Sequence, residues 1–325
     1  MQNVLVTGGA GYIGSHACKA LARAGYNPVV FDNLSRGHAD AVKWGPLVQG
    51  DLRDNGLLRQ TLDEHHIDAV MHFAAFAYVG ESTGQPEMYY DNNVGGMISL
   101  LQAMRDAEVG RIVFSSSCAT YGTPETLPIT EDAPQDPINP YGRTKLICEW
   151  ILRDAATAHG LRFAALRYFN AAGADPDGEI GERHDPETHL LPLALMAAAG
   201  QSELQVFGTD YPTPDGTCIR DYIHVDDLAR AHVLAIEYLG GSGDNLALNL
   251  GTGRGQSVQE VIASVERVTG KVVARCLTPR RDGDPAELTA DPGRAAKVLG
   301  FRAHYTDLDE IVAHAAPWFG HAETK

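Results

Sequence analysis

The sequence predicts an α/β fold, with a Rossmann-like, doubly wound parallel sheet followed by a smaller C-terminal α/β domain. Two observations support this prediction. Short apolar runs rich in β-branched residues alternate with helical stretches, a pattern that favours parallel strands buried on both faces. The first of these runs leads directly into a glycine-rich turn at residues 7–14, a common start for the first helix of such a sheet.

Apolar runs are expected to form the strands of the sheet, and two long stretches its principal helices. Most of the runs lead into Gly, Asp, Asn, Ser or Ala, which suit loops at the carboxyl edge of a parallel sheet, where ligands collect. The expected strands are 4–6, 29–31, 47–48, 69–71, 112–114, 163–166 and 246–250, and the expected long helices are 86–107 and 141–158.

The helix at 86–107 is expected to carry one apolar stripe. Two interpretations of this stripe stay open: it packs on its own sheet, or a second apolar face also pairs with another subunit. On the second interpretation the chain forms a homodimer through the helices near 86–107 and 141–158. The stripe comprises Tyr90, Val94, Met97, Ile98, Leu101 and Met104.

The length of the chain predicts two domains. At 325 residues the chain exceeds the usual size of one compact core. A Pro- and Asp-rich passage at 174–186 follows Gly173 and is interpreted as a crossover loop. We therefore expect a cofactor domain over 1–173, completed by a segment around 221–251, and a substrate domain over 174–325.

The charge and the cysteines limit the partners that the protein can have. A formal net charge of -16, from 42 acidic and 26 basic residues, repels nucleic-acid phosphates and anionic lipid surfaces, so neither is expected as a partner. The five cysteines are widely spaced and lack metal-ligand spacing, so we expect reduced thiols and no metal site. No signal peptide or membrane-spanning run is expected, which favours the cytoplasm.

The glycine-rich turn predicts a pyrophosphate site. Glycines at positions 8, 11 and 14 allow a tight turn, close approach of the backbone to a ligand and close packing of helix on strand. The helix is expected to begin near Ile13, so the N–H groups around Tyr12 and Ile13 point at the phosphates.

The end of the second strand indicates which dinucleotide binds. Asp32, followed by Asn33, is placed to accept hydrogen bonds from the adenosine ribose and to repel a 2'-phosphate, which favours NAD over NADP. Arg36 is a competing phosphate ligand, or a solvated loop residue. Asp51, followed by Leu52, caps the adenine amine or is a plain turn residue.

A tyrosine and a lysine four residues apart form the expected acid/base pair. Tyr141 and Lys145 lie on one face of a helix, where an ammonium can stabilise a phenolate that is otherwise a poor base at neutral pH. The preceding strand ends in serines at 115–117. We favour Ser117 as the residue that bridges a substrate hydroxyl to Tyr141, with Ser116 as the competing candidate, and place Ser115 beside the cofactor.

These motifs together resemble the UDP-glucose 4-epimerases of the extended short-chain dehydrogenase/reductase family. The resemblance covers nearly the whole chain. It is carried by the glycine-rich turn, by Tyr-x-x-x-Lys and by the sequences at 90–94 (YDNNV), 166–170 (LRYFN), 220–225 (RDYIHV) and 279–284 (PRRDGD).

The resemblance implies an NAD-dependent epimerase that inverts C4 of a UDP-sugar through a transient 4-keto sugar. It implies further cofactor contacts from Phe73, Ala74, Ala75, Asn92 and Phe169. The substrate contacts that it implies are Ser117, Tyr141, Asn170, His189, Leu190, Phe207, Arg220, Tyr222, Arg281 and Asp284.

Three positions depart from the family pattern. Ala77 stands where a lysine contacts the cofactor phosphates, so NAD is expected to be held less tightly. Ala119 replaces a threonine near the sugar, and His189 stands where an asparagine often contacts the substrate phosphates. Leu288 lies where residue size affects the choice between hexoses and 2-acetamido sugars, so UDP-N-acetylhexosamines and UDP-pentoses stay open as substrates.

Two other functions are considered. A nucleotide-sugar dehydratase on the same fold needs an acid beside the active-site serine, where this chain has Cys118 and Ala119. A regulator that senses NAD without turnover has no need of the Tyr141 and Lys145 pair. Both alternatives are therefore less favoured than the epimerase.

Overall fold

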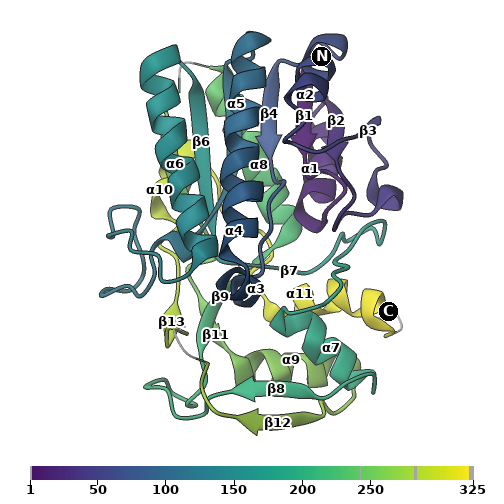
Figure 1. Cartoon of the computed structure of the whole chain (residues 1–325). Helices are drawn as coiled ribbons and strands as arrows, with labels where there is room; N and C mark the ends of the chain where they lie inside the picture. The colour runs from purple at the N-terminus through teal and green to yellow at the C-terminus, as the bar shows by residue number, and fades with distance from the viewer. Residues whose placement is uncertain (1, 242, 282–283, 322–325) are drawn as a thin grey trace.

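A seven-stranded parallel sheet organises the larger part of the molecule (Figure 1). The computed structural model describes residues 2–241, 243–281 and 284–321. All neighbouring strands of this sheet run parallel, as the sequence predicted. The strand order is β10 (Leu246–Leu250), β6 (Arg162–Tyr168), β5 (Arg111–Ser117), β4 (Ala69–His72), β1 (Asn3–Thr7), β2 (Asn27–Asp32) and β3 (Leu47–Gln49).

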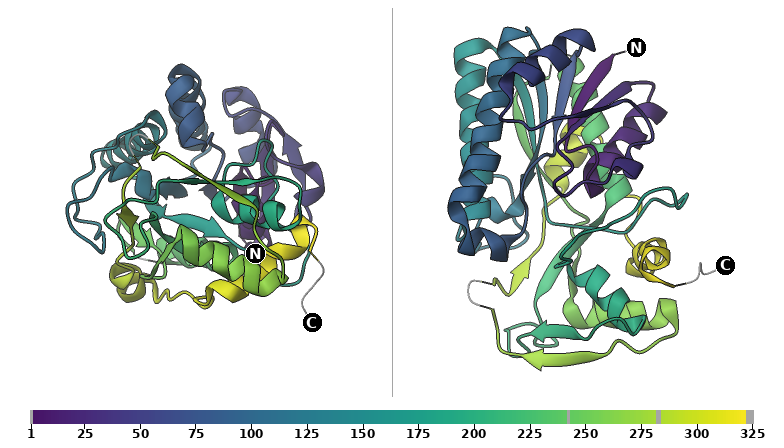
Figure 2. Two further views of the ribbon diagram at one scale, coloured as in Figure 1. Left: turned by 90° about the horizontal axis from the view of Figure 1, so that it is seen from below. Right: turned by 45° about the vertical axis from the view of Figure 1, so that its right-hand side comes forward.

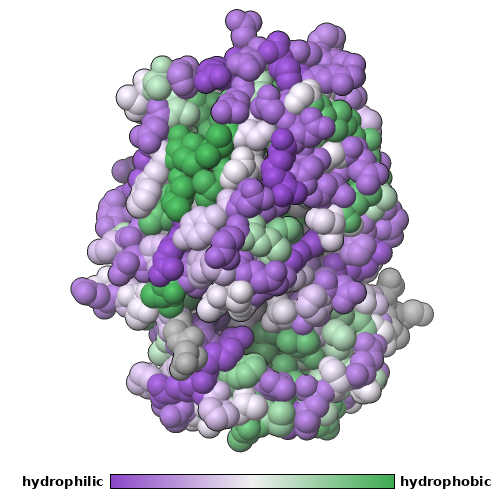
Figure 3. Space-filling view, viewed as in Figure 1, coloured by the Kyte–Doolittle hydropathy of each residue, from purple (hydrophilic) through white to green (hydrophobic). Residues whose placement is uncertain are grey.

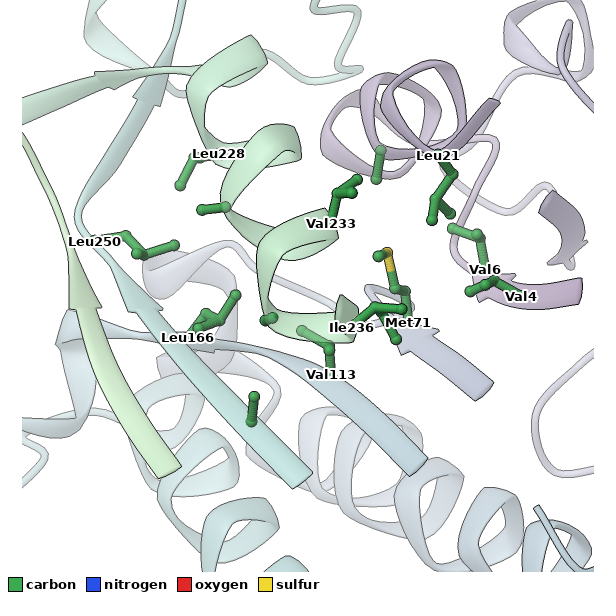
Figure 4. Close-up of a cluster of buried hydrophobic side chains, with 14 of the residues drawn as sticks. Val4, Val6, Leu21, Met71, Val113, Leu166, Leu228, Val233, Ile236 and Leu250 are labelled. Carbon is green, nitrogen blue, oxygen red and sulfur yellow. The ribbon is translucent and has the colours of Figure 1, made fainter. Parts of the chain in front are cut away.

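Helices cover both faces of this sheet, which gives the doubly wound arrangement. On each face, the apolar residues of the helices form one buried cluster with the strands. Figure 4 shows α8 lying across the strands, with Ile236 beside Met71 and Val113. One face carries α1 (Tyr12–Arg23), α8 (Val225–Gly240) and α10 (Gly293–Leu299), and the other carries α2 (Asn55–Glu64), α5 (Gly96–Asp106) and α6 (Pro140–His159).

A smaller α/β part lies at the carboxyl edge of the large sheet (Figure 2). Its helices and several of its strands share a separate buried cluster. One sheet contains β7 (Asn170–Ala172), β9 (Ile219–His224), β11 (Gly255–Ser257) and β13 (Glu287–Leu288), and a second pairs β8 (Leu204–Phe207) with β12 (Arg275–Thr278). The helices are α7 (Leu190–Ala198), α9 (Val258–Thr269) and α11 (Leu308–Ala315).

The chain passes between the two parts more than once. After β9 it returns to the large sheet through α8 and β10, and β10 pairs with β6. Helix α10, from residues later than 251, also packs against the large sheet. The division of the chain into domains at residue 173 stays a prediction.

The helix expected at 86–107 is interrupted. It consists of α4 (Pro86–Tyr89), a π-helical segment at Tyr90–Gly95 and α5, and it is preceded by α3 (Val79–Gly84). Asn93 in the π-helical segment donates to the Phe76 carbonyl (3.0 Å) and to Thr144 Oγ1 (3.0 Å) and accepts from the Phe76 N–H (2.8 Å). The widened turn thus fixes the segment after β4 against α6. Short 3-10 turns occupy Ala39–Ala41, Cys118–Thr120 and Ala316–Phe319.

The apolar stripe predicted on this helix divides between two faces. Met97 and Met104 are fully buried, together with Leu100, but Ile98 is 43% exposed. The interpretation that the whole stripe packs on its own sheet is therefore wrong for Ile98, because adjacent residues of a helix point about 100° apart.

None of the described helices is long and apolar enough to cross a membrane. All five cysteines are free thiols, and four of them are buried.

Four of the buried histidines in the described chain have a lowered pKa. Burial lowers the pKa of His16 and of His232 to about 4. Burial also lowers the pKa of His72 and of His224 to about 3. His232 illustrates the cost of protonation, because its Nδ1 bonds to the Leu228 carbonyl (2.8 Å) while its buried Nε2 has no partner.

These histidines predict a loss of stability in mild acid. A depressed folded-state pKa means that the unfolded chain takes up protons first, so stability is full above about pH 6.5 and falls as the pH approaches 4. The substitution His232→Leu should reduce the stability loss between pH 7.5 and pH 5 by about 2 kcal/mol. Urea unfolding at each pH measures this difference. The exposed His159→Gln is the control, and parallel pH curves for wild type and His232→Leu would contradict the prediction.

Candidate active site

A cavity of about 970 Å³ lies between the carboxyl edge of the large sheet and the smaller part. Every site residue that the sequence analysis predicted lines this cavity, from Gly8 to Asp284. Strand β1 lies between β2 and β4, so the strand order reverses there. The cavity thus opens at the switch point where doubly wound sheets bind their ligands.

The glycine-rich turn leaves no room for side chains. Gly8 has a φ of 73°, and a Cβ on it would lie 2.6 Å from the Ala74 nitrogen. A Cβ on Gly14 would lie 2.2 Å from the Gly8 carbonyl oxygen. Gly11 is the N-cap residue of α1 and gives it no side-chain cap, so the first N–H groups of the helix stay available to an anion. This cradle fits a pyrophosphate.

Asp32 is built into the same turn. Its carboxylate accepts hydrogen bonds from the Ala10 N–H (3.0 Å) and the Leu34 N–H (2.8 Å). Burial raises the pKa of Asp32, and the two N–H groups oppose that rise. Asp32 therefore shapes the turn and also presents a carboxylate to the cavity.

Two polar residues beside the second and third strands are already paired. Asp51 accepts from Arg53 through both oxygens (2.8 and 2.9 Å) and from Asn33 (3.0 Å), and these hydrogen bonds hold the pKa of Asp51 well below its usual range. Arg36 donates to both oxygens of Glu81 (2.8 and 2.7 Å). Arg36 thus has a protein partner, which weakens the interpretation of it as a phosphate ligand.

Tyr141 and Lys145 lie in the first two turns of α6. Asn139 caps this helix by accepting from the Gly142 N–H (2.8 Å). Lys145 Nζ donates to the Ser115 carbonyl (2.7 Å) and lies 5.7 Å from the centre of the Tyr141 ring. Lys145 is 3% exposed, and burial lowers the pKa of its ammonium to about 8. The ammonium is therefore held close to the phenol at a cost in desolvation.

Burial raises the pKa of Tyr141 well above its usual value, and Tyr168 adds to the rise. The Ser117 hydroxyl acts in the opposite direction and lowers the pKa of the phenol. The protein alone therefore favours a neutral phenol. A cationic ligand next to the phenol would favour the phenolate.

The serines at the end of β5 face different surroundings. Ser116 is fully buried and donates to Glu149 Oε1 (2.7 Å), where Glu149 pairs with Arg167 beneath the sheet edge (2.6 Å). Ser117 lines the cavity and accepts from the Ala119 N–H (3.1 Å). This geometry favours Ser117 over Ser116 for a role in the cavity.

Two arginines from the smaller part share one carboxylate across the cavity. Asp284 accepts from Arg220 (2.5 Å) and from Arg281 (2.9 Å). The Arg281 guanidinium lies 4.7 Å from the centre of the Phe207 ring. Two cations and one anion leave a net positive charge beside an aromatic face, which suits a phosphorylated nucleoside. Residues 282 and 283 of the motif at 279–284 lie outside the described residues.

The positions that depart from the family pattern also face this cavity. Ala77 and Ala119 line it and offer no polar side-chain atoms. His189 has two acidic neighbours, Glu182 and Glu187. Burial alone would lower the pKa of His189, but these carboxylates raise it to about 10.

The cavity contains residues that the sequence analysis did not single out. Tyr168 bonds to Ser115 (2.5 Å between hydroxyls), and Tyr78 packs edge-on against His184. Their positions depend on strands and loops far apart in the chain. The spacing of Glu182, His184, Glu187 and His189 was a local signal that could have been noticed.

Comparison with known proteins identifies the family. The model of the NAD dependent epimerase/dehydratase family matches residues 4–251. The chain belongs to this family. The UDP-glucose 4-epimerase of Rhizobium meliloti is 53% identical over 98% of this chain and 97% of its own length.

Solved structures in this family agree with the fold. A UDP-glucose 4-epimerase from Brucella ovis in complex with NAD has a TM-score of 0.98 and 60% identity, and covers 100% of both chains. One from Stenotrophomonas maltophila, with bound NAD and formylated UDP-arabinopyranose, has a TM-score of 0.95 and 46% identity over 98% of each chain. The resemblance predicted from the motifs is thus confirmed, as are the fold class and the NAD cofactor.

Proposed function

We propose that the chain interconverts UDP-glucose and UDP-galactose by reversible oxidation at C4 of the sugar. The observation that carries this proposal is the composition of one cavity. It joins Tyr141, Lys145 and Ser117 on one side to the arginine pair and Phe207 on the other. The acid/base group therefore lies opposite the nucleotide anchor, as an enzyme acting on the sugar of a UDP-sugar requires.

Tyr141 accepts the proton of the C4 hydroxyl in the first step, with Ser117 placed to bridge the two hydroxyls. The Lys145 ammonium stabilises the phenolate that must exist before this transfer. The glycine-rich turn and Asp32 would hold NAD, which would supply the acceptor for the C4 hydride and the source of its return. Tyr141 then gives its proton back to the C4 oxygen.

Inversion requires the sugar to turn while the nucleotide stays fixed. Arg220 and Arg281 hold the diphosphate and Phe207 the base, so the binding energy is concentrated on the part that does not react. Cys118 and Ala119, next to Ser117, line the cavity and offer no carboxylate. A dehydration reaction would therefore lack its acid at this point.

Incubation of the purified protein with UDP-galactose, with and without added NAD, tests this proposal. Appearance of UDP-glucose supports the epimerase. Release of a 4-keto-6-deoxy sugar nucleotide would indicate a dehydratase, and NAD binding with no product would indicate a regulator. The arm without added NAD also reports whether Ala77 leaves the cofactor weakly held.

The sugar specificity is proposed to depend partly on Leu288. Leu288 lines the cavity and packs against the cluster of Cys118 and Phe169. Leu288→Ala should raise kcat/KM for UDP-N-acetylglucosamine relative to UDP-glucose by about tenfold, because pocket size accounts for such ratios. Initial rates on both nucleotides measure the ratio. Leu277→Ala, at a residue 66% exposed, is the control, and an unchanged ratio in Leu288→Ala would remove this role.

We infer that the chain also forms a homodimer through α5 and α6. Figure 3 shows hydrophobic residues gathered on the face formed by these helices. Ile98 on α5 is 43% exposed and Trp150 on α6 is 52% exposed, and Ile147 and Ile151 are half-buried beside them. A contiguous apolar face of this kind is typical of an interface between subunits.

A charged residue in this face should produce a monomer. Trp150→Glu places a carboxylate in the proposed interface, where its desolvation is not compensated. Analytical ultracentrifugation should show a dimer for wild type and a monomer for Trp150→Glu. Val272→Glu, at a residue 80% exposed elsewhere, should leave the dimer unchanged. A wild-type monomer would contradict the inference.

The cytoplasmic location and the absence of a nucleic-acid partner stay predictions.

A further inference from the structure

Four side chains that take no part in the proposed proton and hydride transfers gather between β7 and α7. They are Glu182, His184, Glu187 and His189, and one possible ligand atom of each lies within 4.8 Å of the others. Glu182 Oε1 lies 3.1 Å from Nδ1 of both imidazoles. His189 Nδ1 lies 2.8 Å from Glu187 Oε1, and His184 Nδ1 lies 3.4 Å from Glu187 Oε2. Both histidines thus point their Nδ1 atoms at the two carboxylates.

The two carboxylates of this cluster are buried next to each other. The Glu182 side chain is 4% exposed and the Glu187 side chain is 5% exposed. Within the described chain, no lysine or arginine forms an ion pair with either of them. A nearby acidic group differs in this respect, because it does pair with a lysine. Lys19 forms ion pairs with Asp175, Asp177 and Glu179. Two adjacent buried anions need a cation, which a protonated imidazole of the cluster or a bound metal ion can supply.

Two atoms inside the cluster lack hydrogen bonds. Glu187 Oε2 and His184 Nδ1 are both buried and have no hydrogen-bond partner among the described residues, although they face each other at 3.4 Å. A buried carboxylate oxygen and a buried imidazole nitrogen without partners are costly. Both atoms can donate a lone pair to the same third atom.

We propose that these four side chains bind a divalent transition-metal ion, with zinc as the best match. Zinc takes four ligands in a tetrahedron at about 2.0–2.1 Å, so neighbouring ligand atoms lie roughly 3.3 Å apart. The four carboxylate-to-imidazole distances, 2.8 to 3.4 Å, come close to this value, with Glu187 facing the two imidazoles through different oxygens. One ligand atom from each residue lies within 4.8 Å of the others. Two imidazoles with two carboxylates favour zinc over magnesium or calcium, which prefer oxygen ligands alone.

The proposed ion would fix one wall of the cavity. Glu182, His184 and His189 all line it, and His189 is the N-cap residue immediately before α7. With four protein ligands the site is of the closed, structural kind. It ties the crossover segment after β7 to the start of α7. The cysteine-based expectation of no metal did not address this Glu-x-His-x-x-Glu-x-His spacing.

Zinc binding by the full-length, tag-free protein tests the proposal. After incubation with zinc and extensive dialysis, elemental analysis should find about one ion per chain, as a single tetrahedral site requires. The double variant Glu187→Gln with His184→Gln removes half of the ligands and should lose this ion. Asp177→Asn in the lysine-paired acidic group is the matched control and should keep it. Circular dichroism checks that each variant is folded.

Cobalt provides a second measurement that does not depend on any variant. Cobalt(II) in place of zinc should give the intense visible bands of a four-coordinate site, which zinc then displaces. Thermal unfolding of wild type should shift upward with zinc and return with chelator. Equal zinc content in the wild type and the double variant would overturn the proposal. So would a cobalt spectrum with only the weak bands of a six-coordinate ion. In either case the cluster would be a set of histidine–carboxylate hydrogen bonds without a metal ion. None of these readouts depends on epimerase activity.

Discussion

Tyr141→Phe is expected to lower kcat for the conversion of UDP-galactose to UDP-glucose by about 10³-fold, within the range for loss of a general acid/base. The substitution removes the hydroxyl that exchanges the proton and keeps the ring beside Lys145, 5.7 Å from its Nζ. The binding of UDP should stay nearly unchanged, because the arginine pair and Phe207 lie in the smaller part. Steady-state kinetics and calorimetric titration with UDP measure the two quantities separately.

Tyr168→Phe is the matched control for this prediction. Tyr168 lines the same cavity, but its hydroxyl is bound to Ser115 (2.5 Å). Its loss should change kcat by less than about tenfold, since a neutral hydrogen bond contributes only about 1 kcal/mol. Retention of most of the activity in Tyr141→Phe would contradict its role as the base. A comparable loss in both variants would mean that the whole wall had been disturbed.

Local patterns were sufficient to predict the large sheet and its cofactor turn. The strand and glycine spacing in residues 3–14 depend on neighbours in the chain, and the structure has β1 and α1 where they were expected. The Tyr141 and Lys145 spacing likewise needs only one helix. Such features are encoded within a dozen residues, which is why the sequence reveals them.

Other features depend on contacts between distant segments. The π-helical segment arises where Asn93 reaches Phe76 and Thr144, which no periodicity reveals. The choice between Ser116 and Ser117 required the position of Glu149, one turn after Lys145 on α6. Arg220 and Arg281 were assigned from the resemblance alone, and the structure shows the shared Asp284 that brings them together.

Lys145→Met is expected to abolish activity and, in the cofactor-free protein, to stabilise the fold at neutral pH. The pKa of Lys145 is lowered to about 8 by burial, so at pH 7 the fold holds a charge that it disfavours. The pKa of a lysine in the unfolded chain is about 10.4, so removal of the charge should raise the free energy of unfolding by on the order of 3 kcal/mol. Loss of the hydrogen bond to the Ser115 carbonyl should lower it by about 1 kcal/mol. Methionine keeps a similar volume.

The pH dependence distinguishes this cause from better packing. The unfolded chain holds more protons than the fold between about pH 8 and pH 10.4, so wild-type stability rises there and the advantage of Lys145→Met shrinks. Urea unfolding of the cofactor-free proteins at pH 7 and pH 10 measures this change. The exposed Lys297→Met is the control. If the stability gain of Lys145→Met stays constant with pH, the gain comes from better packing. If Lys145→Met is no more stable than wild type at pH 7, the fold tolerates the buried charge. An advantage that shrinks between pH 7 and pH 10, together with lost turnover, means that Lys145 is kept at the expense of stability because the phenolate of Tyr141 needs a cation beside it.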